Sequence, residues 1–110
     1  MAWKWYDVSQ YKASVGGSTE YGGVQLFGTN FYASLSFHKG GSLPNATIQI
    51  VGADLRFYGH LDYQQMQMVV DLLRNEKPLQ FGWDEQNPNF FKIASGAEPV
   101  GEGDGLLAPG

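Results

Sequence analysis

A chain of 110 residues, of which 43% are hydrophobic and 16% charged, has the size of one folded domain and not the composition of a disordered one. It contains no cysteine, which excludes a disulfide framework, a thiol nucleophile and a zinc site with thiolate ligands. The net charge is −4, and much of it comes from three acids near the C-terminus, so the basic footprint of a duplex-DNA-binding protein is absent.

The N-terminus shows no targeting segment. Its first residues, MAWKWY, lack the apolar stretch of a secretory signal. No run approaches the roughly eighteen apolar residues of a membrane-spanning helix. We therefore expect a cytoplasmic protein that does not contact a membrane.

The N-terminal part of the chain predicts strands separated by glycine-rich turns. Trp3 to Val8 is the first candidate strand, and the segment from Ser14 to Gly23 is a predicted loop. Val24 to Phe27 and Phe31 to His38 form a predicted hairpin around a Gly-Thr-Asn turn. The second of these strands alternates strictly between apolar and polar side chains, so one of its faces is expected in the core.

Two further strands are predicted before the helix. After a loop over residues 39–45, Thr47 to Val51 alternates, and Ile48 and Ile50 are expected to point into the core. A turn at residues 52–54 leads to Leu55–Tyr58, where Leu55 and Phe57 share the core side.

A single helix is predicted from about Asp62 to Glu76. Asp62 and Gln65 have the spacing of a capping box at its start. Pro78 ends it, because the residue before a proline is driven out of the α region. Its apolar side chains recur with helical spacing and are expected to face the core: Met66, Val69, Val70 and Leu73.

The remaining segments predict a second hairpin and a tail. Residues 79–83 alternate as a strand, Asp84 to Asn89 is a turn-rich loop, and Phe90 to Ala94 is the last strand. The order favours an α+β fold: an antiparallel sheet of about five to seven strands with one amphipathic helix, residues 62–76, on one face. We expect one domain over residues 1–97 and a flexible glycine-rich, acidic tail over 98–110.

The two histidines are the first candidates for chemistry. His38 ends a strand, and His60 lies just before the helix, near Asp54 and Asp62. A histidine beside a carboxylate suits acid–base work or metal binding. No third ligand or nucleophile has the spacing to complete a site, so we expect no catalytic residues, no metal and no cofactor.

The sheet face that the helix leaves uncovered is the stronger candidate. Its expected residues are mostly neutral and polar, with two tyrosines and a few cations, which suits an interface because a ring adds contact area and keeps a polar end. The candidate binding residues are Tyr32, His38, Arg56, Tyr58 and Lys92.

Three functions remain open from sequence. The favoured one is a non-catalytic binding or assembly module that acts through this face or an edge strand, as a homodimer or with a protein partner. The second is a single-stranded nucleic-acid-binding protein that stacks bases on the tyrosines beside Arg56 and Lys92. The third is a small enzyme centred on His38 and His60.

Overall fold

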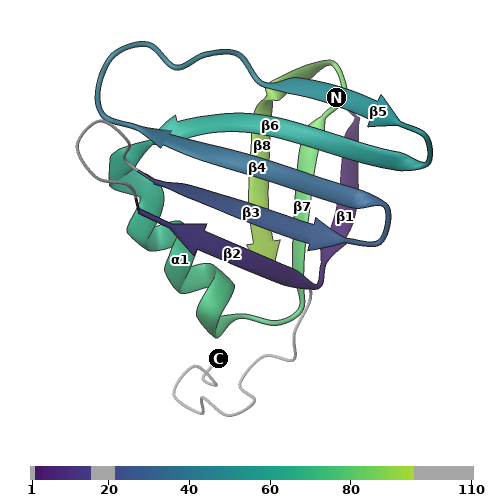
Figure 1. The fold of residues 1–110 in the computed structure, drawn as a ribbon, viewed down its shortest axis with the longest axis horizontal. Helices are drawn as coiled ribbons and strands as arrows, with labels where there is room; N and C mark the ends of the chain where they lie inside the picture. Colours follow the sequence, from purple (N-terminus) through teal and green to yellow (C-terminus); the bar gives the residue numbers. More distant parts are fainter. Residues whose placement is uncertain (1, 16–21, 96–110) are drawn as a thin grey trace, which may run out of the picture.

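The protein folds as two β-sheets that pack face to face, with a helix at one end. The computed structural model describes residues 2–15 and 22–95 (Figure 1). The expected loop and tail therefore lie largely outside the described residues. The strands are β1 (Trp3–Val8), β2 (Gln10–Ser14), β3 (Gly23–Gly28), β4 (Phe31–His38), β5 (Thr47–Val51), β6 (Asp54–Asp62), β7 (Leu79–Asp84) and β8 (Asn87–Ser95).

The expected single antiparallel sheet is corrected in two ways. One sheet has three antiparallel strands in the order β1-β7-β8, and the other has five in the order β2-β3-β4-β6-β5. In the larger sheet β4 and β6 pair in parallel. The reason is that β5 takes the outer position and the chain then turns at Gly52, whose φ is 64°, so that β6 enters between β4 and β5.

The first two strands connect the sheets. Ser9 separates β1 from β2, and its backbone N–H donates to the carbonyl oxygen of Phe27 at 2.8 Å. The chain thus leaves the three-stranded sheet and enters the five-stranded one within a single residue. Polar β2 was not predicted as a strand.

The core lies between the two inner sheet faces. The inward side chains of β3 and β4 are buried, as the alternation predicts. Phe57 is fully buried, and its ring contacts Phe81, Trp83 and Phe91, with centroid distances of 4.9–5.2 Å. Ile48 and Ile50 lie on the inner side of β5, as predicted, but they are exposed and not part of the core. The reason is that the three-stranded sheet is narrower than the five-stranded sheet and does not reach its edge strand β5.

The helical segment begins as predicted. Asp62 accepts from the backbone N–H of Gln64 at 2.8 Å, and the Gln65 side chain accepts from the Asp62 N–H at 3.3 Å, which completes the capping box. A 3₁₀ turn η1 (Tyr63–Gln65) leads into α1 (Met66–Asn75).

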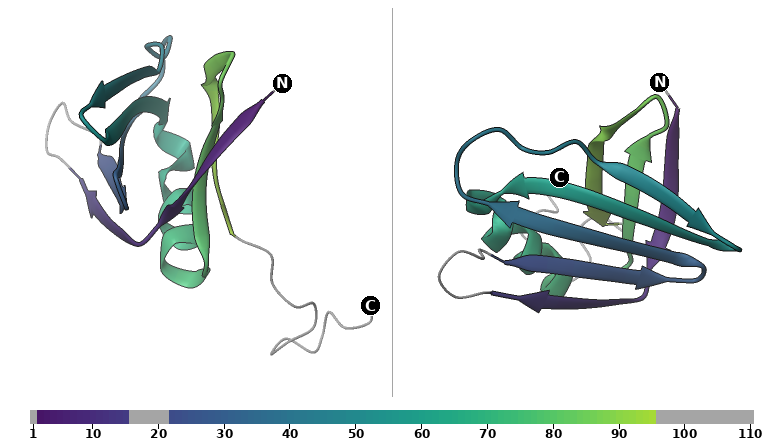
Figure 2. Two further views of the ribbon diagram at one scale, coloured as in Figure 1. Left: turned by 90° about the vertical axis from the view of Figure 1, so that its right-hand side faces the viewer. Right: turned by 45° about the horizontal axis from the view of Figure 1, so that its top comes forward.

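The position of α1 differs from the prediction. The helix lies at one end of the sandwich, between the edges of the two sheets, and does not cover a sheet face (Figure 2). For that reason only Leu73 of the apolar stripe is fully buried, while Met66, Val69 and Val70 are half-buried. Among the described residues, no helix is long and apolar enough to cross a membrane.

The hairpin after the helix is longer than expected. The turn is confined to Glu85 and Gln86, and residues 87–89 already belong to β8. Pro88 is tolerated in that strand because β8 is an edge strand, where the missing N–H interrupts no central ladder.

Candidate functional site

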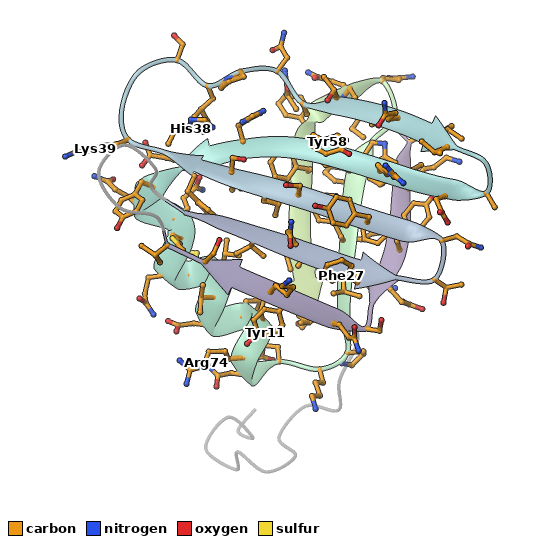
Figure 3. All side chains as sticks on the ribbon, in the orientation of Figure 1. Tyr11, Phe27, His38, Lys39, Tyr58 and Arg74 are labelled. Atoms are coloured by element: carbon orange, nitrogen blue, oxygen red, sulfur yellow. The ribbon has the colours of Figure 1, made fainter. Side chains whose placement is uncertain are left out.

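The outer face of the five-stranded sheet carries a row of aromatic side chains, which we call the aromatic face. It comprises Phe27 on β3, Tyr32 on β4, and Arg56 and Tyr58 on β6. The sheet register places these side chains together, because Phe27 pairs with Tyr32 and Tyr32 pairs with Arg56. Their neighbours in the chain point into the core, so pleating turns this set outward (Figure 3).

The rings of the aromatic face contact one another across three strands. The centroids of Phe27 and Tyr32 are 5.4 Å apart, and those of Tyr32 and Tyr58 are 6.2 Å apart with an edge-to-face angle of 67°. The Gln25 side-chain amide donates to the Tyr32 hydroxyl at 2.9 Å. These contacts hold the rings in place at a surface that no described helix or strand covers.

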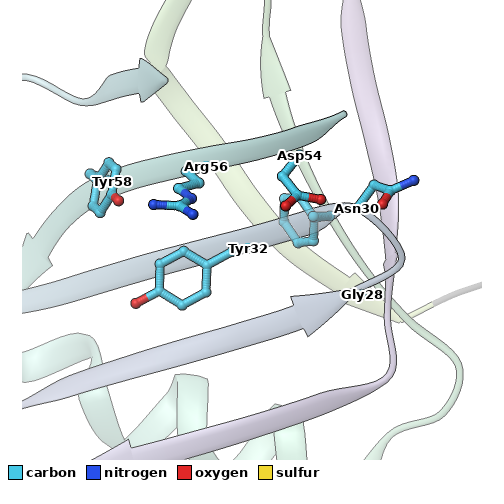
Figure 4. A pocket seen from close by; sticks show the side chains of 7 residues that line it. Gly28, Asn30, Tyr32, Asp54, Arg56 and Tyr58 are labelled. Carbon is cyan, nitrogen blue, oxygen red and sulfur yellow. The ribbon is translucent and has the colours of Figure 1, made fainter. Parts of the chain in front are cut away.

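A hollow of about 490 Å³ lies on the aromatic face and is lined by Tyr32, Arg56 and Tyr58, with Asp54 and Asn30 at its end towards the turns (Figure 4). Arg56 is half-buried there. Within residues 2–15 and 22–95 its guanidinium makes no ion pair and no side-chain hydrogen bond. The hollow therefore presents a cation with its donors available, beside two ring systems.

This arrangement can hold a flat ring together with an anionic group. A guanidinium offers five N–H donors in a planar fork that matches phosphate or carboxylate oxygens. Tyrosine rings offer apolar faces for stacking. Of the candidate residues predicted from sequence, the structure brings Tyr32, Arg56 and Tyr58 together at this hollow.

His38 lies on the same sheet face but at the other end of its strand, where it contacts His60. His38 Nε2 and His60 Nδ1 are 2.8 Å apart, so one ring donates a hydrogen bond to the other. Burial lowers the pKa of His60 below its usual 6.5, and the positive charge of His38 lowers it further.

The hollow beside the two histidines takes only one of them into its lining. A small hollow of about 210 Å³ beside them is lined by His60 and by residues 43–46, and His38 is not part of its lining. No group of three or more histidine, aspartate or glutamate side chains that could hold a metal ion occurs in the described part of the chain.

Lys92, the fifth candidate, lies on the other sheet. It is on β8, and its side chain points away from the core on the outer face of the three-stranded sheet, since its neighbours Phe91 and Ile93 pack against the core. Its ammonium nitrogen lies 4.8 Å from the ring centroid of Trp3. Lys92 therefore cannot act together with Arg56 on one surface.

Two larger hollows lie at the helix end of the molecule. One of about 760 Å³ is lined in part by Leu79, which pairs with Ser95, the last described residue. Another of about 570 Å³ is lined in part by Val15, which precedes residues 16–21. Because both border segments outside the described residues, we assign no site to them.

Sequence reasoning missed two side chains of this surface. Phe27 alternates with buried Val24 and Leu26 in β3, and that alternation was sufficient to place it outward. Lys12 on β2 pairs with Gln25 and so lies on the same outer face, but β2 itself was not predicted.

No family model, no curated protein and no solved structure matches this chain.

Proposed function

We propose that this protein is a non-catalytic binding module whose contact surface is the aromatic face, and that its ligand is single-stranded nucleic acid. The observation that carries the proposal is the half-buried Arg56 guanidinium, which pairs with none of the described residues and lies in a hollow lined by Tyr32 and Tyr58. Bases would stack on the rings, and a phosphate between them would accept from the guanidinium.

The chemistry of the face suits a single strand better than a duplex. Every unpaired base exposes a flat π-face, and aromatic side chains displayed on open sheets are a recurring platform for such bases. Arg56 is the cation of the aromatic face, and Lys12 on β2 lies on the same outer side of the sheet, so the electrostatic contribution is limited. Binding should therefore depend on stacking more than on charge.

The shape of the face favours a ligand over a second copy of the same surface. Two-fold pairing of the aromatic face with the axis through the hollow would set one hollow opposite its copy and would fill neither. A base with its phosphate is convex at that scale and supplies the acceptor that no described residue gives Arg56.

The test is fluorescence anisotropy with a labelled single-stranded oligothymidine. Tyr58→Ala should weaken binding by about 1–3 kcal/mol, the usual contribution of one stacked base. Arg56→Gln should also weaken it and should reduce the slope of log K against log salt by about 0.7, because one phosphate contact is lost.

Matched controls come from the rest of the chain. Arg74→Gln makes the same substitution at an exposed position on α1, and Phe90→Ala removes an exposed ring from the other sheet. Both should bind like the wild type. Wild-type protein that fails to bind, or Arg74→Gln and Arg56→Gln with equal affinities, would contradict the proposal.

A further inference from the structure

The four edge strands of the two sheets differ in how they are protected. Exposed edges invite pairing with another strand, and proteins commonly block them with lysine, proline or bulges. Among the described strands, β2 carries Lys12, β1 carries Lys4, and β8 carries Pro88, Lys92 and a register irregularity opposite Trp83 and Asp84. Three of the four edges thus have a recognised block.

The fourth edge, β5, has none. Its sequence TIQIV contains no charge and no proline, and three of its five residues are β-branched and apolar. Those three are exposed: Ile48 by 37%, Ile50 by 72% and Val51 by 44%. The strand pairs only with β6 and leaves its other backbone edge open among the described elements.

From this contrast we infer that β5 pairs with β5 of a second copy of the chain. An antiparallel pair with its two-fold axis at Gln49 sets Ile48 of each copy opposite Ile50 of the other, on the inner side of the sheet. Four exposed isoleucine side chains would then form one apolar cluster. Because β5 is uncharged, the two-fold axis brings no like charges together.

The pairing has a geometric consequence for the aromatic face. An antiparallel strand pair keeps outward side chains on the same side, so the two five-stranded sheets would continue as one and both hollows would face the same way. A contact based on five-residue strands is small compared with the roughly 800 Å² per partner of stable complexes. We therefore expect a weak dimer that forms at high protein concentration.

Sedimentation velocity from low to high micromolar concentration tests the inference. The wild type should shift towards dimer as concentration rises, and Ile50→Lys should remain monomeric, because it places a charge in the apolar cluster. Met68→Lys is the matched control: Met68 is also 72% exposed but lies on α1, so this variant should dimerise like the wild type. Hydrogen exchange should show the amides of residues 47–51 becoming more protected with concentration.

Two results would overturn the inference. One is a wild type that is monomeric over the whole range. The other is an Ile50→Lys variant that dimerises like the wild type, while Tyr32→Ala combined with Tyr58→Ala abolishes the dimer, which would assign the interface to the aromatic face. The exposed position of residue 50 means that the lysine variant should stay folded, and its circular dichroism checks this.

Discussion

The outer faces of the two sheets carry similar groups, aromatic rings beside a cation, in opposite arrangements. On the three-stranded sheet, Trp3 and Trp5 stack with centroids 5.7 Å apart, and the Lys92 ammonium lies over Trp3. The Gln80 amide next to them donates to the Asp7 carboxylate at 3.1 Å. On this face the polar and aromatic groups satisfy one another.

On the five-stranded sheet the corresponding cation makes no ion pair and no side-chain hydrogen bond with the part of the chain that the structure describes. Arg56 lies in a hollow between rings, and no described carboxylate pairs with it. Composition alone therefore does not distinguish these two surfaces. The two surfaces differ in whether the cation lies against one of the rings, as Lys92 does, or between them without a described partner, as Arg56 does. This difference can be seen only once the strands are placed in the sheets.

The largest expected effect separates the two sides of a single strand. Phe57→Ala removes a fully buried ring between the sheets and should lower the free energy of unfolding by about 3–5 kcal/mol, a large part of the stability of a small domain. Tyr58→Ala, one residue along β6, should cost about 1 kcal/mol or less because its ring faces outward. Urea unfolding of both variants measures the difference.

Two variants of similar stability would contradict the assignment of inner and outer faces. The same pair also sharpens the functional comparison, since Tyr58→Ala should bind the oligonucleotide more weakly while it stays folded at temperatures where Phe57→Ala has melted.

The second prediction concerns the outer face of the three-stranded sheet. A Cβ atom at Gly82 would lie 2.5 Å from a ring carbon of Trp5, so the indole rests directly on the glycine backbone. Gly82→Ala should force that ring to move and should destabilise the protein by about 1–3 kcal/mol. Tryptophan fluorescence should shift to the red as Trp5 becomes more exposed.

The same variant tests whether the two faces are independent. Oligonucleotide affinity should match that of the wild type at temperatures where both are folded, since Gly82 and Trp5 lie on the other sheet. A parallel loss of affinity would show that the comparison between the faces is wrong.

Local patterns predicted the elements well where alternation and turn residues agreed. The bounds of β1, β4 and β5 match the prediction, and β4 and β5 have turn-forming residues next to them in the chain. β2 was missed since, of its five side chains, only Tyr11 is even half-buried. The start of β8 was missed because Asn-Pro-Asn has turn propensity that its place at a sheet edge overrides.

Pairing between strands was not predictable from the same patterns. Alternation correctly put Ile48 and Ile50 on the inner side of β5, but their exposure depends on how far the opposite sheet extends. The parallel pairing of β4 with β6 depends on the position that β5 takes in the sheet after a long loop. No local sequence pattern specifies that position.

The candidate site was predictable to the same extent. Alternation put Tyr32, Arg56 and Tyr58 on outward faces of two strands, and the β4·β6 register then brought them together. It put Lys92 outward as well, but alternation within a strand does not say to which sheet the strand belongs. The hydrogen bond between His38 and His60 likewise required the register, which places the two strand ends side by side.

The smallest expected effect comes from that histidine pair, and it depends on pH. Since the pKa of His60 in the folded protein lies below the 6.5 of the unfolded chain, the unfolded chain binds more protons between these two values. The stabilisation is therefore complete above about pH 6.5 and is lost as the pH falls through the lowered pKa. The part of this shift that comes from His38 has a structural basis, because the two ring nitrogens are 2.8 Å apart and, when both rings are charged, neither can accept a hydrogen bond.

Thermal melts between about pH 7.5 and pH 5, a range above the usual pKa values of carboxylates, isolate this contribution. The wild type should lose stability as the pH falls, His38→Gln should lose less because the second cause of the lowered pKa is gone, and His60→Gln should lose least. Asp62 and Lys39 are the other charged residues near this end of the sheet, and both are unchanged in the variants. Equal pH profiles for the wild type and His60→Gln would show that the pair makes no titratable contribution.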